Sequence, residues 1–301
     1  MAGGLSGRVV VDWGSSNFRA YRFAGDGAMV ESHAAAAGIL SVTDGDYAAV
    51  LVREIGGWLA PGVEVLLSGM ITSRNGWVET PYVPCPATLG ALADGAITQP
   101  GPAGSVCRFL PGVSALAPTP DVMRGEEIQV FGVIDPGETA TVVLPGTHSK
   151  WVQMEKGVIT GFRTFLTGEV YALLKSQSII GRLIPSGEAP FSEAAFLDGV
   201  EQANAAGSIS LLNDVFTARS GALLGAFGVE MIADRLSGLL IGHELKAGLS
   251  LPGARHGRLV LVGDPSLVTR YAAALKRLGR TSDAGPPHAA VDGFSRLVAS
   301  A

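Results

Sequence analysis

The sequence feature that most constrains the fold is a strand–turn–strand pattern that occurs twice. In residues 9–23 a short apolar run leads into Gly14–Asn17, and an extended pattern then resumes. Residues 141–154 repeat the arrangement, with an apolar run, the turn residues Gly146–Ser149 and a second extended run. Each copy continues into a third extended run after a Gly-containing turn. The repetition predicts two three-stranded meanders and therefore a duplicated architecture.

Both turns have a composition that suits phosphate binding. Consecutive backbone N–H groups and hydroxyls in such turns can hold phosphate oxygens. Asp12, at the end of the first apolar run, could hold the accompanying cation directly or through water. The alternative is an ordinary hairpin whose acidic residue faces solvent, and Lys150 could likewise face water. The phosphate contacts assigned to the turns come from Gly14, Ser15, Ser16, Asn17, Gly146, Thr147, His148, Ser149 and Lys150.

The duplication also predicts two domains, residues 1–135 and 136–301. The segment 135–137, Asp-Pro-Gly, is interpreted as the hinge between them. In the first meander, the Gly-Asp-Gly segment 25–27 is the predicted second turn. Residues 191–247 are predicted to be helical throughout.

Several segments resemble the 2-dehydro-3-deoxygalactonokinase family, within the superfamily of sugar kinases, actin and heat-shock chaperone ATPases. The matches cover nearly the whole chain, from about residue 8 to about residue 275. The segments are Val11–Ser16, Gly69–Ala87, Asp121–Glu127, Leu144–Val152, Thr164–Glu169 and Leu236–Glu244.

The resemblance implies an α/β fold of two RNase H-like (actin-like ATPase) domains, with mixed sheets flanked by helices and a cleft between them. It implies a kinase that uses ATP and Mg²⁺ to phosphorylate 2-dehydro-3-deoxy-D-galactonate in galactonate breakdown. Asp12 would hold the metal. A turn at Gly263 would lie against the adenosine, although Asp264 stands where the superfamily usually has a second glycine.

The loop from Ile71 to Pro86 follows a predicted buried strand at 65–67, and ligand sites gather at the carboxyl ends of such strands. The loop is long and rich in polar and aromatic side chains, which is typical of binding loops. Arg74 could pair bidentately with a carboxylate. A surface loop stiffened by prolines is the alternative. The residues assigned to the sugar acid are Ser73, Arg74, Trp77, Glu79, Tyr82 and, outside the loop, Arg124.

A helix is predicted to start near Gly125, with Glu126 and Glu127 in its first turn. By resemblance, a general base opens this helix, and Glu126 occupies the nearest place, although an Asp is usual there. Asp121 and Glu127 are the alternatives. Acidic residues in a first turn also complement the helix dipole and need no further role.

The composition excludes several classes of function. The net charge of the 301 residues is -5 and there is no basic block, so nucleic-acid binding is not expected. The sequence shows no signal peptide and no apolar run long enough to span a bilayer. Cys85 and Cys107 lack metal-ligand spacing and indicate reduced thiols in a cytoplasmic protein. A homodimer is expected.

Two other functions remain open. One is a kinase for a different sugar acid, because epimers differ only in the direction of one hydroxyl. The other is a non-enzymatic nucleotide switch of the actin type. Signatures of P-loop kinases, dinucleotide-binding folds and zinc hydrolases are absent from the sequence.

Overall fold

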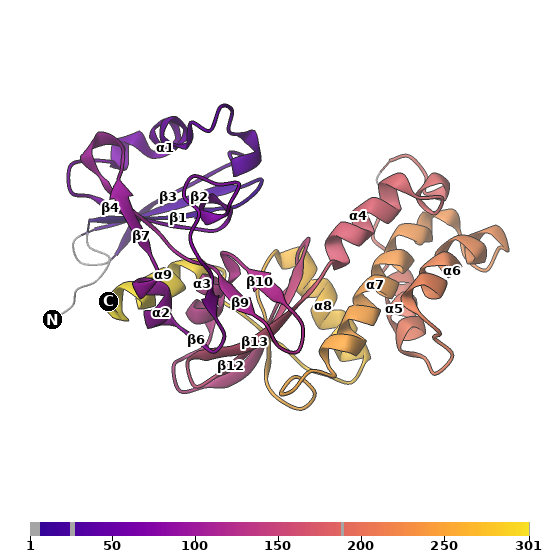
Figure 1. Cartoon of the computed structure of the whole chain (residues 1–301). Coiled ribbons are helices and arrows are strands. Elements are labelled where there is room, and N and C mark those ends of the chain that lie inside the picture. The colour runs from indigo at the N-terminus through magenta and orange to yellow at the C-terminus, as the bar shows by residue number, and fades with distance from the viewer. Residues whose placement is uncertain (1–6, 25–27, 188–189, 301) are drawn as a thin grey trace. The chain divides into compact units, whose positions relative to one another are not determined.

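A computed structural model describes residues 7–24, 28–187 and 190–300 (Figure 1). The chain forms two compact units, each described here by itself. The first comprises Met1–Thr139, Met154–Phe162 and Pro286–Ala301, and the second comprises Ala140–Gln153 and Arg163–Gly285. The predicted turn at 25–27 lies outside the described residues. Among the residues described, every helix is too short or too polar to cross a membrane.

The first unit is built on a mixed sheet of order β3-β2-β1-β4-β8-β7. The meander β1–β2–β3 is antiparallel, while β4 and β8 continue from β1 in parallel. Parallel neighbours place the ends of β1 and β4 at the same sheet edge, with Asp12 opposite Ser68. The strands are β1 (Arg8–Trp13), β2 (Phe18–Phe23), β3 (Met29–Ala35), β4 (Glu64–Ser68), β7 (Ile97–Pro100) and β8 (Val106–Phe109).

Smaller elements complete this unit. A three-stranded sheet contains β5 (Val83–Pro84), β9 (Val113–Ala115) and β10 (Asp121–Met123). β6 (Ala87–Thr88) pairs antiparallel with the first two residues of β13 (Val158–Phe165). The helices are α1 (Tyr47–Ile55), α2 (Leu89–Asp94), α3 (Glu126–Val133) and α9 (Ala289–Ser300).

The C-terminal helix α9 packs against α3. Gly132 of α3 and Gly293 of α9 lie where the two helices cross. A Cβ atom on Gly132 would lie 1.9 Å from Ala289 O, and one on Gly293 would lie 1.9 Å from Ile128 O. Arg296 donates to the carbonyl oxygen of Phe131 at the end of α3. By its contacts, residues 286–301 therefore group with the first unit, although the predicted second domain, 136–301, includes them. The division into domains at residues 1–135 and 136–301 stays a prediction.

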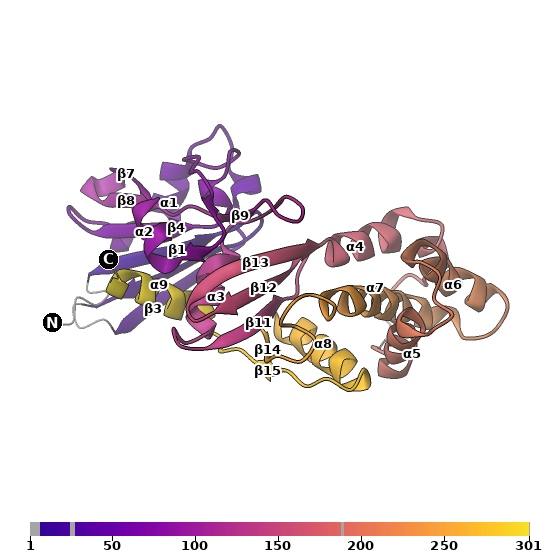
Figure 2. The same cartoon turned by 60° about the horizontal axis from the view of Figure 1, so that its bottom comes forward.

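The second unit contains the other meander, and its strands follow the order β15-β14-β11-β12-β13 (Figure 2). β14 is parallel to both β11 and β15. The strands of this sheet are β11 (Thr139–Leu144), β12 (Ser149–Glu155), β13 (Val158–Phe165), β14 (Leu259–Leu261) and β15 (Asp283–Ala284). By contacts, the end of β12 and most of β13 fall within Met154–Phe162 and are counted with the first unit. The helices of the second unit are α4 (Thr167–Gln177), α5 (Glu193–Asn204), α6 (Leu211–Leu223), α7 (Ile232–Gly248) and α8 (Pro265–Arg277).

Figure 1 shows α5, α6 and α7 side by side, so the predicted helical region 191–247 is three helices rather than one continuous run. α5 and α7 approach closely because Gly199 and Gly238 face the partner helix: a Cβ atom on Gly238 would lie 1.9 Å from Phe196 O. Two mixed α/β sheets that each begin with an antiparallel meander confirm the predicted two-domain RNase H-like fold.

Candidate active site

Two carboxylates and two glycines meet where β1 and β4 end and α3 begins. Gly69, directly after β4, has a φ of 94°, and Gly125, directly before α3, has a φ of 108°. A Cβ atom on Gly125 would lie 3.1 Å from the Cα of Gly69, and one on Gly69 would lie 2.8 Å from Trp13 O. Only glycine fits such positions. This close approach brings the first residue of α3, Glu126, near Asp12.

The electrostatics of Asp12 reflect this arrangement. Burial raises the pKa of the Asp12 carboxyl, the Arg19 guanidinium at 3.5 Å opposes that rise, and the charge of Glu126 adds to it. Two carboxylates that interact in this way suit two different roles, one as a cation ligand and one as a proton acceptor.

The donor chemistry at Asp12 fits a Mg²⁺ ion held mainly by water and substrate. Gly69 and Gly125 place no side-chain atom next to Asp12 Oδ1. A Cβ atom on Gly69 would lie 3.3 Å from this oxygen, and one on Gly125 would lie 3.9 Å from it. Within the described ranges, no group of three or more His, Cys, Asp or Glu side chains forms a metal cage. Mg²⁺ is commonly held by one or two carboxylates, waters and substrate phosphates, and Asp12 is suited to that kind of site.

The first turn is held from its carbonyl side. Gly38, Ile39 and Leu40 donate their N–H groups to the carbonyl oxygens of residues 16, 14 and 15. Gly38 makes this contact possible, since a Cβ atom there would fall 2.2 Å from Ser15 O. Across the described residues, the N–H groups of Ser15, Ser16 and Asn17 carry no hydrogen bond. The turn therefore offers consecutive donors to a ligand.

The alternative bases lie in different surroundings. Glu127 is fully buried and accepts hydrogen bonds from the N–H of Gly125 at 2.8 and 2.9 Å. Burial, followed by the nearby charge of Glu126, raises the pKa of Glu127 to about 8. Asp121 begins β10, opposite Ala115, at the end of that strand remote from α3, and accepts from its neighbour Val122. Of the three carboxylates, Glu126 is the one that acts on Asp12.

Arg124 holds the substrate loop from within. Its side chain is 9% exposed, and Nη1 donates to Thr72 Oγ1 at 2.7 Å and to Thr80 Oγ1 at 2.6 Å. Nη2 donates to Thr80 O at 3.0 Å, and the guanidinium stacks 4.3 Å from the centre of the Tyr82 ring. The predicted substrate residues Arg124 and Tyr82 therefore contact each other and brace the loop.

The remaining loop residues divide into an inner and an outer set. Ser73 is buried and donates to Met70 O, while the Trp77 ring packs edge-on against Phe109 in the core of the first unit. Arg74 and Glu79 are exposed. The structure thus brings Arg74 and Glu79 to the surface of the loop, whereas Ser73 and Trp77 support it from inside.

In the second unit, the start of α4 packs directly on the turn that follows β11. A Cβ atom on Gly168 would lie 2.5 Å from Gly146 O, and Glu169 N donates to Thr147 O at 3.0 Å. The His148 ring and the Glu169 carboxylate pair across this contact. The segment Thr-Gly-Glu at 167–169 thus packs on the turn and supports it. The sequence did not predict this contact.

Two predicted phosphate-binding residues of this turn are directed inward. Ser149 is fully buried, and its hydroxyl accepts from Gly146 N at 3.4 Å and bonds to the Tyr271 hydroxyl at 3.1 Å. Lys150 is also buried, and its Nζ donates to Thr164 Oγ1 at 2.8 Å. The outer face of the turn is formed by Gly146, Thr147 and His148.

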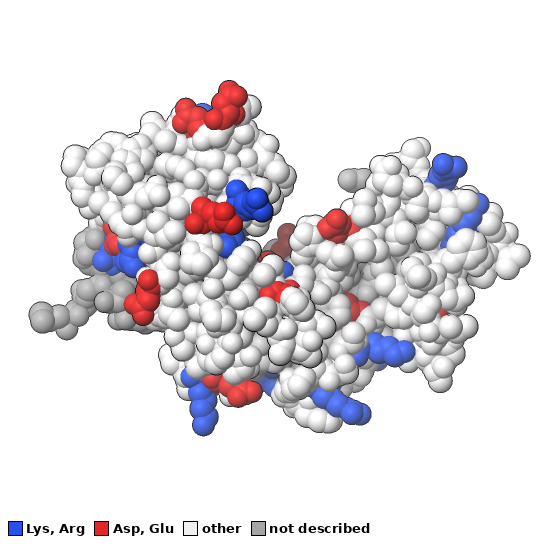
Figure 3. All heavy atoms as spheres, viewed as in Figure 1, with Lys and Arg blue, Asp and Glu red and all other residues white. Residues whose placement is uncertain are grey.

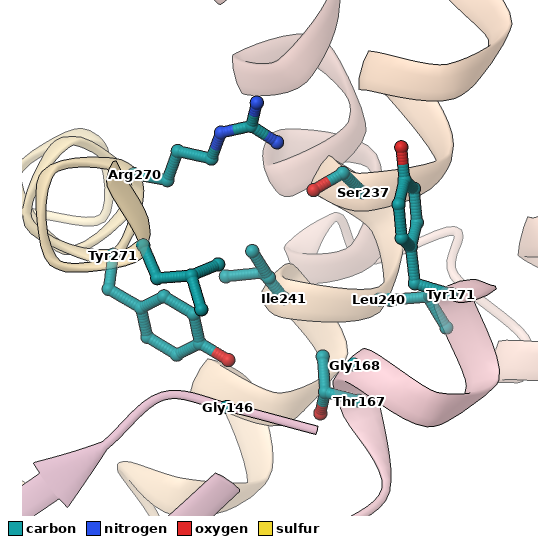
Figure 4. Close-up of a pocket in the computed structure, with 10 residues that line it drawn as sticks. Gly146, Thr167, Gly168, Tyr171, Ser237, Leu240, Ile241, Arg270 and Tyr271 are labelled. Carbon is teal, nitrogen blue, oxygen red and sulfur yellow. The ribbon is translucent and has the colours of Figure 1, made fainter. Parts of the chain in front are cut away.

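A small pocket of about 80 Å³ lies beside this turn, between α4, α7 and α8 (Figure 4). Figure 4 shows the Arg270 guanidinium and the Ser237 hydroxyl directed toward each other across the pocket, with the Tyr271 ring coming from the same helix as Arg270. The lining residues are Gly146, Thr167, Gly168, Tyr171, Ser237, Leu240, Ile241, Leu267, Arg270 and Tyr271.

The residues predicted to contact adenosine precede α8, which supplies one wall of this pocket. Gly263 has a φ of 148° and lies against Pro145 O, where a Cβ atom would be 3.2 Å away. Asp264 caps α8, accepting from Ser266 N at 2.9 Å, and the hydrogen bonds from the Ser266 hydroxyl and then from the N–H groups of Ser266 and Leu267 hold the pKa of its carboxyl below the usual range. The lining residues Tyr171, Ser237 and Arg270 were missed because they lie far apart in the sequence on helices of ordinary composition.

Charged side chains are sparse on the surface. Figure 3 shows them as small separate groups on a mostly uncharged face, in keeping with a charged content of 16%.

An RNase H-like fold with a strand-end carboxylate, a second carboxylate beside it and a strand–turn–strand in each unit is compatible with an ATP-dependent phosphotransferase. Comparison with known proteins narrows this class. The family model for 2-keto-3-deoxy-galactonokinase matches residues 12–297. The chain belongs to this family and is an ATP-using kinase.

Individual relatives agree with that membership. The chain is 34% identical to 2-dehydro-3-deoxygalactonokinase of Escherichia coli (strain K12) over 272 residues, 90% of each chain. It is 33% identical to a Rhizobium meliloti (strain 1021) protein described as a probable 2-dehydro-3-deoxygalactonokinase, over 90% of this chain and 89% of the relative. A crystal structure of a Sinorhizobium meliloti protein, described in the same terms, superposes with a TM-score of 0.88 at 32% identity, covering 96% and 97% of the two chains.

Proposed function

We propose that the protein transfers the terminal phosphoryl group of ATP to the primary hydroxyl of 2-dehydro-3-deoxy-D-galactonate. The product would be the 6-phosphate, formed in the breakdown of D-galactonate. The observation that carries the proposal is the meeting of Asp12 and Glu126 between Gly69 and Gly125, in a chain that belongs to the family described above.

Phosphate binding is assigned to the turns. In the first, the unbonded N–H groups of Ser15, Ser16 and Asn17 would donate to phosphate oxygens. In the second, the exposed face formed by Gly146, Thr147 and His148 has the same role. Asp12 would hold Mg²⁺, which when bound neutralises phosphate charge. Lys150 is assigned a smaller role in phosphate binding, because its ammonium group donates a hydrogen bond to Thr164.

Glu126 is assigned as the general base. In a loose phosphoryl-transfer transition state the attacking hydroxyl is still largely protonated, so the carboxylate mainly orients the hydroxyl and accepts its proton late. The N–H of Arg124 donates to Glu126 Oε2 at 3.0 Å and fixes one oxygen of the carboxylate. The other oxygen remains for the substrate. Asp121 lies at the end of β10 that is remote from α3 and is not assigned this role.

The sugar acid is assigned to the loop that Arg124 braces. Arg74 is the exposed guanidinium of the loop and would form a two-pronged pair with the substrate carboxylate. Glu79 and the Tyr82 hydroxyl would bond sugar hydroxyls. The nucleoside is assigned to the pocket between α4, α7 and α8, with Gly263 and Asp264 positioning α8 behind it.

An assay of ADP release across a panel of sugar acids tests the proposal. We expect 2-dehydro-3-deoxy-D-galactonate to give the highest kcat/KM and its gluconate epimer a lower one. The variant Asp12→Asn should abolish turnover while its thermal unfolding stays normal, because the amide cannot replace the charge of the carboxylate. Highest activity on another sugar acid would correct the substrate. ATP binding without phosphorylation of any member of the panel would favour a nucleotide switch.

A homodimer in the cytoplasm is the proposed state of the protein in the cell. Support for association comes from exposed apolar side chains on and beside α6, among them Ile209 at 81%, Leu212 at 82% and Leu224 at 86% exposure. Exposed apolar side chains are common on association surfaces. Sedimentation equilibrium of the purified protein would test the dimer, and a single species of monomer mass would contradict it.

A further inference from the structure

A buried carboxylate beneath the pocket of the second unit has no part in the proposed chemistry. Glu244 lies on α7, one turn beyond Leu240 and Ile241 of the pocket lining, and is 3% exposed. A buried carboxylate without partners would be costly. Glu244 is instead surrounded by hydrogen-bond donors from three other elements.

Each donor comes from a different part of the unit. Trp151 Nε1 of β12 donates to Oε1 of Glu244 at 2.9 Å. The Tyr271 hydroxyl of α8 donates to Oε2 at 2.7 Å, and the Thr167 hydroxyl at the start of α4 donates to the same oxygen. Two of the three donors, Tyr271 and Thr167, also line the pocket.

The hydrogen bonds form a chain with a definite direction. The Tyr271 hydroxyl has one proton and gives it to Glu244, so its oxygen must accept from Ser149 Oγ. Ser149 likewise uses its proton on Tyr271, and its oxygen accepts the N–H of Gly146. The chain runs from the turn after β11, through Ser149 and Tyr271, to Glu244.

A second arm reaches the same turn from the other side. Thr167 is tied to Glu244, and the adjoining Gly168 packs 2.5 Å, at its Cβ position, from Gly146 O. The carboxylate therefore fixes both the turn and the α4 start that lies on it. Burial raises the pKa of Glu244, whereas the hydrogen-bonding side chains of Thr167, Trp151, Tyr271 and Ser149 act in the opposite direction.

We infer that Glu244 is a positioning residue for ATP: through Tyr271 and Thr167 it sets the geometry of the turn at Gly146 and of the adjacent pocket. The inference rests on the proposed assignment of this turn and pocket to ATP. Glu244 itself touches neither ligand. Its loss should weaken ATP binding and leave the sugar acid unaffected.

The test is Glu244→Gln, which keeps the volume but replaces one acceptor oxygen with a donor. One of the three donors then faces another donor. We expect the KM for ATP and the directly titrated Kd for ATP to rise about tenfold or more, the scale of a lost hydrogen bond to a charged group. The KM for the sugar acid should stay within about twofold, an allowance of roughly 0.4 kcal/mol.

Trp151→Phe is the matched control. It removes a donor to the same carboxylate, but one that comes from the core of the sheet and does not line the pocket. It should lower the unfolding temperature without changing the Kd for ATP. An equal rise in the ATP Kd for Glu244→Gln and Trp151→Phe would show that Glu244 acts only through stability and would overturn the inference.

A double-mutant cycle with Tyr271→Phe tests the chain itself. If Tyr271 acts through Glu244, the double variant should raise the ATP Kd by much less than the product of the two single effects. Full multiplicativity would overturn the chain. A wild-type protein that binds no ATP would refute the proposed function as well, whereas normal ATP binding by Glu244→Gln would refute only the positioning role.

Discussion

At the scale of single residues, the site depends on what surrounds each carboxylate. Asp12, Glu126 and Glu127 belong to one unit, and the charge of Glu126 raises the pKa of both Asp12 and Glu127, but Glu127 is fully buried. Arginine shows the same division. Arg124 is enclosed by threonine oxygens and a tyrosine ring, while Arg74 is exposed. Residue type alone does not distinguish these roles.

Glu126→Gln should lower turnover by about 10²–10⁴-fold, the usual loss for a general base. It should also move the acid limb of the pH profile of kcat/KM for ATP to lower pH. The charge of Glu126 raises the pKa of Asp12, so its removal lets Asp12 ionise at lower pH. Arg19→Leu should move the limb the opposite way, because Arg19 lowers that pKa. An unmoved limb in both variants would dissociate Asp12 from the pH dependence.

Arg74→Lys should raise the KM for the sugar acid and leave the KM for ATP unchanged. Lysine keeps the charge but loses the two-pronged geometry, a difference of about 1–3 kcal/mol for a charged hydrogen bond. Steady-state kinetics with each substrate varied in turn measures this. Arg124→Lys serves as a comparison: it should mainly lower the unfolding temperature. A sugar-acid KM raised by Arg124→Lys but not by Arg74→Lys would transfer the carboxylate contact to Arg124.

At the scale of elements, glycines decide which helices and turns come together. Gly69 and Gly125 join the strand ends to α3, Gly168 seats α4 on its turn, and Gly199 with Gly238 lets α5 and α7 cross closely. At each of these positions, the lack of a side chain lets two backbone segments come into direct contact.

Gly238→Ala should destabilise the protein by about 1–3 kcal/mol or more, because the new methyl group would meet Phe196 O at 1.9 Å and force α5 and α7 apart. Gly90→Ala on α2 is the control. Its nearest atom, Thr88 Oγ1, is 3.9 Å away, so the lower conformational entropy of the unfolded variant should stabilise the protein by about 0.4–1 kcal/mol. Denaturant titration measures both. Equal stability of Gly238→Ala and the wild type would contradict the close crossing.

At the scale of the whole molecule, buried acidic groups make stability depend on pH. Folding raises the pKa of Glu127 from 4.5 to about 8. The protonated form is therefore favoured in the folded state, and stability that is complete below pH 4.5 is lost as the pH rises to about 8.

Glu127→Gln removes this loss. Relative to the wild type, the variant should gain stability between pH 5 and pH 8, on the order of 3–5 kcal/mol at the upper end. The difference in free energy of unfolding, measured by denaturant titration at several pH values, should grow with pH. A constant difference across this range would mean that Glu127 ionises normally in the folded protein.

The sequence by itself determined the local parts of this protein. The two meanders, the turns at Gly14–Asn17 and Gly146–Ser149, and Asp12 at a strand end could all be predicted, because alternation and turn chemistry act within a few residues. The helix start near Gly125 was predicted for the same reason, and α3 begins at Glu126.

Only the tertiary structure decided which of these residues meet. Glu126 reaches Asp12 because β1 and β4 pair in parallel and two glycines permit backbone contact. Ser149 is directed inward because its hydroxyl bonds to the Tyr271 hydroxyl, which in turn donates to Glu244, a residue far along the chain. Such encounters depend on the register of strands and the crossing of helices. Sequence patterns carry no direct record of either, since many registers bury the same apolar residues.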